Sequence, residues 1–225
     1  MKTVTWTLSL NRLETTPDVK CELLMKQVEQ LTSRITDLEQ LIRVGKEIPL
    51  FAAANNDYYK LSSNRRKVIS TGYTGEWHSI LSEKSLSEMG NKFQISLDVI
   101  ENGQTVMIGV ANQNTDTTGG VFSKTGSWML CISKSHSYDY DEDSIFTSKY
   151  EFFEDGIYEN LGEKNQFSNG SLLVVSIAPA FGTNLLSFEL DGALLHIVGF
   201  SLATNTSDLL AAVDLRDEGT SVSFV

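Results

Sequence analysis

The stretch that decides the fold runs from Lys92 to Trp128 and reads KFQISLDVIENGQTVMIGVANQNTDTTGGVFSKTGSW. Its first eight residues alternate polar and apolar side chains, which is the pattern of a strand buried on one face. Asn102-Gly103 supplies a turn that tolerates positive φ, and Val106 to Val110 follows as a nearly all-apolar strand. These features predict a β-hairpin, followed by a polar loop that a tryptophan closes.

The same pattern returns in the second half of the chain. Short breaks separate three apolar runs, at residues 171–177 (SLLVVSI), 185–190 (LLSFEL) and 193–200 (ALLHIVGF). Asp191-Gly192 supplies the turn between the last two. Strands that follow one another at short intervals, with glycine-containing turns, are typical of all-β sandwiches. We therefore predict a mainly β protein built as a two-sheet antiparallel sandwich.

Composition narrows the class of protein. With 225 residues and 41% hydrophobic content, the chain can bury one sizeable core and carry an appendage. A net charge of -11 gives it no general attraction for nucleic acid or for an anionic membrane surface, so we expect neither as a partner. The basic patch at Lys60 and residues 65–67 is interpreted as a solvated loop. No run approaches the roughly 18 apolar residues that a membrane span needs.

Cysteine usage and the first residues bear on the compartment. Cys21 and Cys131 lie far apart in different segments, which argues against a disulfide framework. The first eleven residues lack the apolar core of a secretory signal. We therefore expect a cytoplasmic protein, in which the glycosylation sequons at Asn169 and Asn205 are chance matches.

The chain is expected to begin with a strand-like segment, residues 1–15, and a long helix, residues 16–46. In the first segment apolar and hydroxyl side chains alternate, and its apolar members are Val4, Trp6, Leu8 and Leu10. Such a strand needs an edge to pair with, in this chain or in a partner. The helix starts at Thr16, which is followed by Pro17 at the first helical position and by an acidic residue in the first turn.

The helix has the pattern of a coiled coil. Apolar residues recur at alternating spacings of three and four, at Cys21, Leu24, Val28, Leu31, Ile35, Leu38 and Ile42. β-Branched residues at a positions and leucine at d positions favour a parallel two-stranded coil. We therefore predict that residues 18–45 form a homodimer or pair with a helix of another chain, through Leu24, Val28, Leu31, Ile35, Leu38 and Ile42. Apolar side chains beside this seam widen the face and leave open that the helix packs on its own sandwich; they are Leu23, Met25 and Leu41.

The sandwich is assigned to residues 68–225. Residues 47–67 have no clear period and are interpreted as a connector with room for one first strand. From Val68 onward glycine, serine and threonine become frequent between apolar runs, as expected of strands joined by turns.

An ordered series of short sequences within residues 68–225 resembles the SPRY (B30.2-type) domain family. The series is GEWHSIL (75–81), KFQISL (92–97), MIGVA (107–111), GSWML (126–130), NGSLLVVSI (169–177), LLSFELDG (185–192), GF (199–200) and LLAAVDLRDEGTSVSF (209–224). Ser171 and Ala178 stand where members of the family usually carry aspartate, and Asp191 replaces the usual turn asparagine. The resemblance implies a divergent member, with a bent β-sandwich that binds a peptide or protein surface through loops at one end and performs no chemistry.

The binding surface is expected around the loop at residues 112–120, NQNTDTTGG. This loop is polar, ends in glycine and lies between two strands, which suits recognition from a rigid scaffold, although an ordinary solvent-exposed loop has the same composition. The resemblance places the ligand-binding positions at Tyr73, Thr118, Gly120, Val121, Arg216, Asp217 and Glu218.

No motif predicts a metal, a cofactor or catalysis. Asp139, Asp141 and Asp143 match positions 1, 3 and 5 of a calcium loop, but Ser144 and Tyr150 stand where glycine and glutamate are needed. We therefore expect a surface loop here, with no metal site. The histidines His78, His136 and His196 are scattered, and no nucleophile or phosphate-binding motif appears. The sequence does not predict an enzyme.

The predicted function is non-catalytic protein–protein interaction, as an adaptor or as a structural subunit of a larger assembly. In this hypothesis the sandwich docks a target through its loops and the helix joins the protein to a second copy or to a partner. The alternative is a lectin-like sandwich that binds glycans, with Tyr73, Trp77 or Trp128 stacking on a sugar.

Overall fold

The computed structural model describes residue 28 and residues 48–53, 57–71, 76–137, 145–164, 167–180, 182–201 and 204–225. The chain divides into two units, Met1–Arg43 and Val44–Val225. The predicted strand-like segment and the predicted coiled-coil helix lie outside the described residues, apart from Val28, which is helical and exposed.

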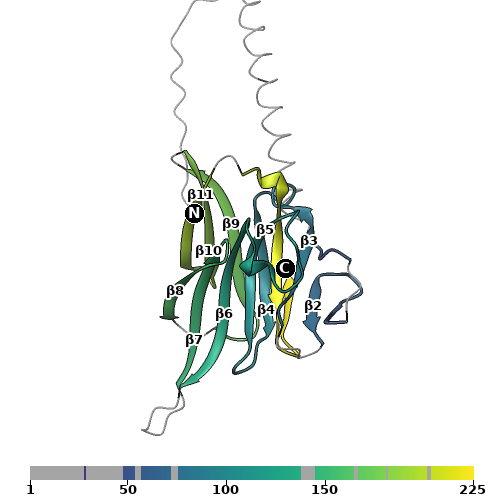
Figure 1. Ribbon diagram of the computed structural model, residues 1–225, viewed down its shortest axis with the longest axis vertical. Coiled ribbons are helices and arrows are strands. Elements are labelled where there is room, and N and C mark those ends of the chain that lie inside the picture. The colour runs from purple at the N-terminus through teal and green to yellow at the C-terminus, as the bar shows by residue number, and fades with distance from the viewer. Residues whose placement is uncertain are drawn as a thin grey trace, which may run out of the picture. The chain divides into compact units, whose positions relative to one another are not determined.

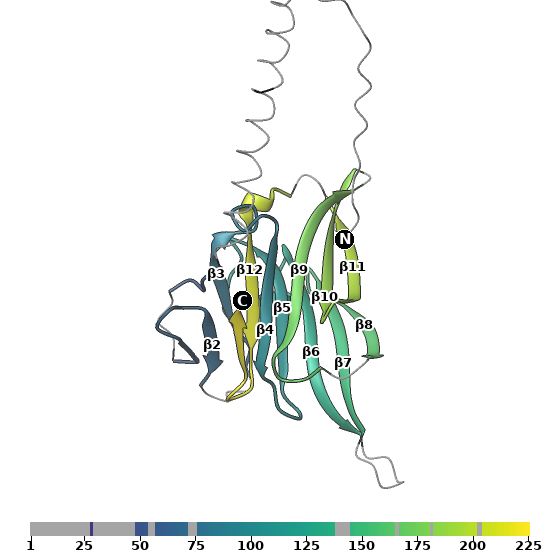
Figure 2. The same ribbon diagram turned by 180° about the vertical axis from the view of Figure 1, so that it is seen from behind.

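The second unit is a mainly β sandwich of two antiparallel sheets (Figures 1 and 2). The first sheet has the strand order β1-β2-β13-β4-β9-β10-β11 and the second has the order β3-β12-β5-β6-β7-β8. The first sheet contains β1 (Tyr59–Leu61), β2 (Lys67–Ser70), β4 (Lys92–Val99), β9 (Ser171–Ala180), β10 (Thr183–Leu190), β11 (Ala193–Phe200) and β13 (Ser221–Phe224). The second contains β3 (His78–Ser85), β5 (Thr105–Asn112), β6 (Ser127–Ser137), β7 (Ile145–Glu154), β8 (Ile157–Lys164) and β12 (Leu209–Leu215). Two short 3-10 helices, η1 (Val121–Ser123) and η2 (Thr206–Asp208), lie in connections.

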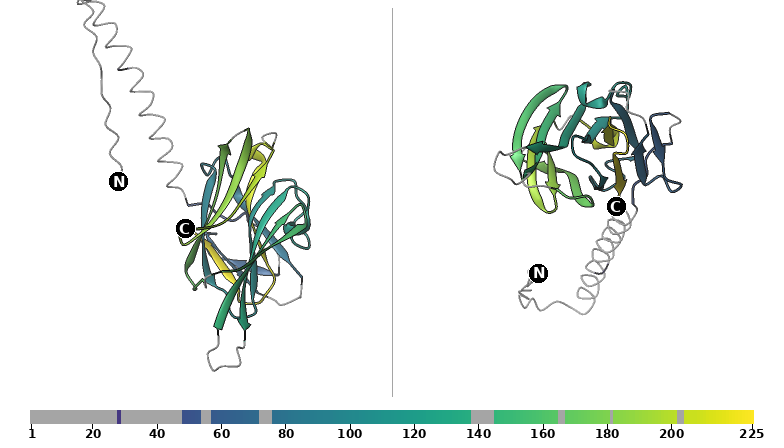
Figure 3. Two further views of the ribbon diagram at one scale, coloured as in Figure 1. Left: turned by 90° about the vertical axis from the view of Figure 1, so that its left-hand side faces the viewer. Right: turned by 90° about the horizontal axis from the view of Figure 1, so that it is seen from below.

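The main core fills the space between the two sheets, which the left view of Figure 3 shows as two facing layers. Alternate residues of each strand point into it, as the period-2 pattern predicted. On β4 the inward residues Phe93, Ile95 and Leu97 are buried, while the residues between them are half-buried. The sequence prediction of an antiparallel two-sheet sandwich is therefore confirmed.

The predicted turn at Asn102-Gly103 forms, but the predicted hairpin does not. Gly103 has a φ of 82°, as expected, yet β4 and β5 belong to different sheets and do not pair. The reason lies in β5, which is buried on both faces from Val106 to Ala111 and needs a central position between β12 and β6. The chain crosses from one sheet to the other through Ile100, which is fully buried. In the second half the expected pairing is correct, because β9, β10 and β11 are consecutive neighbours.

The sandwich begins before residue 68, inside the segment interpreted as a connector. Phe51 is fully buried, forms a bridge with Ser82 of β3 and places its ring 4.4 Å from that of Phe224. Tyr59 is also buried and starts the edge strand β1. An aperiodic sequence concealed this contribution, because a three-residue strand is too short to show alternation.

Candidate binding surface

The loop between β5 and β6 crosses the outer face of the second sheet, and its residues 113–126 are called the η1 loop here. Val121 is fully buried within a small second core on that face. This second core consists of Met107, Ala111, Val121, Met129, Cys131 and Ala212, with Trp77, Leu81, Phe122 and Phe153 packed against it. The predicted recognition loop is therefore partly an inward-packed segment rather than an ordinary solvent-exposed loop.

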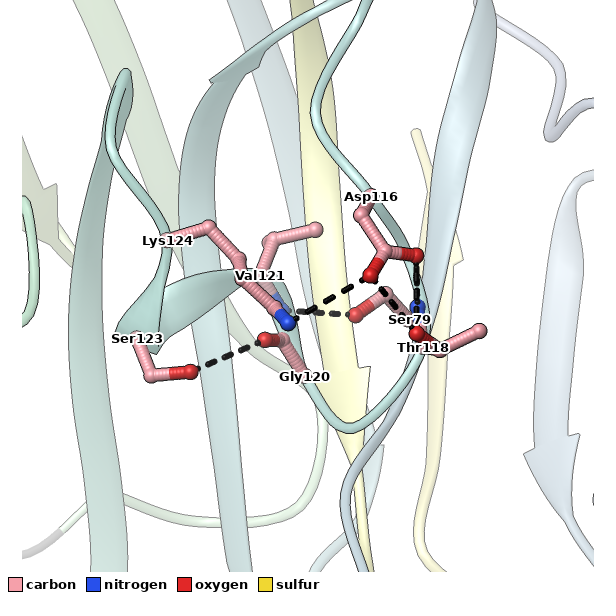
Figure 4. Close-up of polar contacts among 7 residues, drawn as sticks. All are labelled: Ser79, Asp116, Thr118, Gly120, Val121, Ser123 and Lys124. Atoms are coloured by element: carbon pink, nitrogen blue, oxygen red, sulfur yellow. Dashed lines mark hydrogen bonds and ion pairs between the residues drawn. The ribbon is translucent and has the colours of Figure 1, made fainter.

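Side chains of two strands and of the turn after β7 hold the η1 loop by its backbone. The N–H of Val121 donates to Ser79 Oγ on β3 at 2.8 Å, as Figure 4 shows. The N–H of Phe122 donates to Asp214 Oδ2 on β12 at 3.0 Å. At the far end of the loop, the N–H of Gly126 donates to the carboxylate of Asp155, which follows β7, at 2.6 Å. These contacts join the loop to side chains distant in sequence, so its conformation depends on the sandwich as a whole.

Two features of position 120, its backbone conformation and its close neighbours, require glycine. Its backbone has a φ of 84° and a ψ of 130°, a conformation that other residues rarely adopt. A Cβ at this position would also lie 2.7 Å from the ring of Phe122 and 2.8 Å from the Cβ of Trp77. The loop can therefore enter the second core only with glycine here.

The tip of the η1 loop is exposed and polar. Asp116 accepts hydrogen bonds from the N–H of Thr118 at 3.0 Å and from the hydroxyl of Thr118 at 2.7 and 2.8 Å. Lys124 Nζ lies 3.4 Å from Asp116 (Figure 4). These contacts lower the pKa of the Asp116 carboxyl, the hydrogen bonds from Thr118 contributing most. The tip thus offers an ordered carboxylate and two threonine side chains to solvent.

Aromatic side chains form a row across the same face. Ring centroids are 5.5 Å apart between Trp77 and Phe122, 5.3 Å between Phe122 and Phe153, and 5.6 Å between Phe153 and Tyr158. At one end of the row, the guanidinium of Arg216 lies 5.0 Å from the centroid of the Trp77 ring. Tyr158, at the other end, is half exposed. Partly exposed aromatic and arginine side chains are the types that contribute most at protein interfaces.

Four of the seven predicted ligand-binding residues lie at this surface, where Thr118 is exposed and Arg216 half-buried, while Gly120 and Val121 are buried beneath it. Thr118, Gly120 and Val121 belong to the η1 loop, and Trp77 connects Gly120 to Arg216 through direct contacts with both. Tyr73 lies outside the described residues.

The two remaining residues have structural contacts. Asp217 is buried and accepts a hydrogen bond from the N–H of Thr105 at 2.7 Å and another from Arg216 Nε at 3.1 Å. Glu218 has an exposed side chain, and its carbonyl accepts from Gln104 Nε2 at 2.7 Å. Asp217 therefore fixes the turn that positions Arg216, and its carboxylate faces the protein.

Sequence reasoning did not assign Phe122, Ser79 or Asp214 to the surface, and considered Trp77 only as a sugar platform. Asp214 is the most informative of these because it is fully buried on the outer face of β12. A single carboxylate in the otherwise apolar run LLAAVDL (209–215) was the available signal, since an unpaired buried charge is rare. No such signal marks Ser79, because buried serines are common in sheets.

Two further polar side chains, those of His196 and Cys131, lie among apolar residues. The ring of His196 packs 4.5 Å from that of Phe152, inside the sandwich. Burial raises the pKa of the Cys131 thiol to about 12, which keeps it in the protonated form near neutral pH. Within the described ranges, no group of three histidine, cysteine or acidic side chains could hold a metal ion. The calcium-like aspartates lie outside those ranges, but Tyr150, at position 12 of that pattern, is fully buried in β7.

In the part of the chain that the structure describes, no helix is long and apolar enough to span a membrane.

No family model and no curated protein matches the sequence of this chain. Its structure is similar to a human SPRY domain, with a TM-score of 0.52 and 13% identity over 76% of this chain and 96% of that one. The SPRY domain of human HERC1 aligns with a TM-score of 0.43 and 13% identity over 77% and 96% of the two chains. The carbohydrate recognition domain of Emp46p aligns with a TM-score of 0.44 and 10% identity over 80% and 94%. At these identities the likeness concerns the fold, and the sandwich has a SPRY-like fold.

Proposed function

We propose that this protein is a non-catalytic interaction protein, in which the SPRY-like sandwich binds a peptide or protein surface at the η1 loop and the adjoining Trp77 and Arg216 side chains. One observation carries this proposal. The η1 loop is fixed to the sheet by Ser79, Asp214 and Asp155, while its tip remains exposed and polar.

A loop held in this way can bind without first losing conformational entropy. Ordering a free loop on binding reduces affinity, and an anchored loop has already met that cost during folding. The Trp77 and Phe122 rings and the Arg216 guanidinium add a partly exposed aromatic and cationic region beside the tip. The combination of a polar tip and an aromatic base suits a peptide or protein surface with both polar and apolar groups.

The wider role is proposed on the sequence. The helix at residues 18–45 would join the protein to a second copy or to another chain, so that it acts as an adaptor or as a subunit of a larger assembly in the cytoplasm. Two weak sites on one chain act together through effective concentration.

The proposal is tested by selecting binders with a displayed library of random linear peptides on the immobilised full chain, in the presence of a chelator and free sugars. Enriched peptides should bind with a measurable Kd, and Thr118→Arg at the exposed tip should raise that Kd at least tenfold. Ser168→Arg is the matched control, because Ser168 is also exposed and lies in the turn before β9. Peptides that bind the Thr118→Arg and wild-type chains equally would contradict the proposal.

Glycan binding is less well supported by the described side chains. Trp128 is buried, and its indole N–H donates to Glu154 at 2.9 Å, so its ring does not offer a stacking platform. The guanidinium of Arg216 lies over the ring of Trp77, in the position that a stacked sugar would need on that face. Binding to a glycan array that free sugar competes away would nevertheless favour the lectin-like alternative.

A further inference from the structure

Asp214 lies on the outer face of the second sheet with none of its surface exposed. Its Oδ2 accepts the N–H of Phe122 at 3.0 Å. The Ser79 hydroxyl accepts the N–H of Val121 at 2.8 Å and also hydrogen-bonds the Asp214 carboxylate. The carboxylate therefore lies where the η1 loop meets the sheet.

The two carboxylate oxygens of Asp214 differ in their hydrogen bonds. Asp214 Oδ1 is buried and has no hydrogen-bond partner among the described residues. A buried oxygen without a donor is costly when it carries charge and much less so when the acid is neutral. Burial accordingly raises the pKa of Asp214 to about 6, against hydrogen bonds from Ser79, Phe122 and Val121 that favour the ionised form.

We propose that Asp214 is a positioning residue that couples closure of the η1 loop to the binding of one proton. The loop covers Asp214 and keeps water from it, because the backbone N–H groups of Val121 and Phe122 bind Ser79 and Asp214 directly. When the loop lifts, the carboxylate meets water and regains its ordinary acidity. The closed loop therefore binds the proton more tightly than the open loop, and by linkage the proton favours the closed loop.

The size of the pH effect on loop closure follows from the pKa of Asp214 in the closed and in the open loop. With a pKa of about 6 when the loop is closed and the ordinary 3.8 when it is open, the closing equilibrium is about tenfold more favourable at pH 5 than at pH 8. In one respect the inference rests on the proposed function: a partner that binds the closed loop should bind about tenfold more tightly at pH 5. The coupling within the loop itself requires no partner.

Other groups around Asp214 also titrate or carry charge. On the elements packed against it they are His78 on β3, Lys124 after η1, Cys131 on β6, and Arg216 and Asp217 after β12, while β5 presents Met107. Arg216 and Asp217 are ion-paired, and Cys131 stays protonated because burial raises its pKa to about 12. His78 is the group to control, because it is a histidine next to Ser79 and desolvation lowers its pKa.

The test is hydrogen–deuterium exchange of the full chain between pH 5 and pH 8, with exchange corrected for the intrinsic pH dependence of amide chemistry. Protection in peptides that cover residues 119–126 should rise about tenfold from pH 8 to pH 5 in the wild-type chain. Asp214→Asn, which is neutral at every pH, should show strong protection with no pH dependence. Flat protection in the wild-type chain, or a transition that survives in Asp214→Asn, would overturn the proposal.

Three further variants assign the transition. His78→Gln and Asp155→Asn should both keep it, and its loss in His78→Gln would assign it to the histidine and overturn the proposal. Ser79→Ala removes a hydrogen bond that favours the ionised carboxylate, so the midpoint should move to higher pH. This last variant also serves if Asp214→Asn does not fold, and an unmoved or lowered midpoint would count against Asp214.

The two proposals fail in different ways. If Thr118→Arg abolishes peptide binding while exchange of the loop is independent of pH, the proton coupling is wrong and the binding surface stands. If exchange follows the predicted pH dependence while Thr118→Arg leaves binding unchanged, the coupling stands and the binding surface lies elsewhere.

Discussion

The guanidinium of Arg216 lies 5.0 Å from the centroid of the Trp77 ring and forms an ion pair with Asp217 at 3.1 Å. This contact joins the turn after β12 to the segment before β3 and so defines one end of the proposed binding surface. A cation over an indole ring is worth about 0.5–1 kcal/mol at a partly exposed site.

Replacing Arg216 by alanine or by lysine distinguishes the effect of its charge from the effect of its flat contact with the Trp77 ring. Arg216→Ala should lower the free energy of unfolding by about 1 kcal/mol, measured by urea titration. It should also weaken the binding of the peptides selected from the library. Arg216→Lys keeps the charge and should recover only part of both losses, because an ammonium lacks the flat surface that covers the ring. Full recovery by lysine would show that charge alone matters.

Gly120→Ala tests whether the loop needs glycine for contact as well as for backbone conformation. Its Cβ would meet Phe122 and Trp77 at 2.8 Å or less, so the variant should lose about 2–4 kcal/mol of unfolding free energy. Gly119→Ala is the matched control: its φ of 72° is also positive, but a Cβ there meets nothing within 4 Å. It should lose only about 1 kcal/mol, from backbone strain. Equal losses would show that the contacts with the aromatic rings are unimportant.

Asp214 should also make overall stability depend on pH. Because burial raises its pKa to about 6, the folded chain binds the proton more tightly than the unfolded chain, where the ordinary value is 3.8. The free energy of unfolding therefore falls as pH rises between these values, by up to about 3 kcal/mol. The difference between wild type and Asp214→Asn in urea titrations at pH 5 and pH 7.5 isolates this contribution. A difference that is the same at both values would contradict it.

Cys131 should be unreactive until the sandwich unfolds. It is 3% exposed, and burial raises the pKa of its thiol to about 12. In a Cys21→Ser chain, Ellman's reagent at pH 8 should therefore label no thiol in the native protein and one thiol in concentrated urea. Rapid labelling of the native chain would mean that the second core opens readily.

The role of the helix can be measured by light scattering of the full chain beside a chain that starts at Val44. We expect a dimer for the full chain and a folded monomer for the shorter one. The shorter chain keeps Phe51 and Pro49, which are buried in the sandwich. A full chain that is monomeric at every concentration would rule out self-association and direct attention to a partner helix.

Sequence pattern predicted the long strands β4, β5, β9, β10 and β11 from their apolar residues, but it missed β1, which has only three residues. It predicted the pairing of β9, β10 and β11 correctly, since short turns bring consecutive strands together. It failed at β4 and β5, where the all-apolar Val106 to Val110 signalled a strand covered on both faces and hence a neighbour other than β4.

The candidate surface was predicted in part, and for a different reason. Thr118, Gly120 and Arg216 followed from a family resemblance, which supplies positions without their contacts. The anchors Ser79 and Asp214 come from strands far apart in sequence and meet the loop only after the sheet has formed. Pairings of that kind depend on topology, which local patterns do not contain.

The order of the strands also affects how the protein is made. The two strands latest in the sequence, β12 and β13, are interior strands: β13 pairs with β2 and β4, and β12 pairs with β3 and β5. Until a ribosome has synthesised residues 209–224, β1, β2 and β3 have no neighbour through which to join the other strands of their sheets. The sandwich must therefore be completed after the synthesis of these residues, and an emerging chain exposes two unfinished strand edges of the kind that chaperones protect.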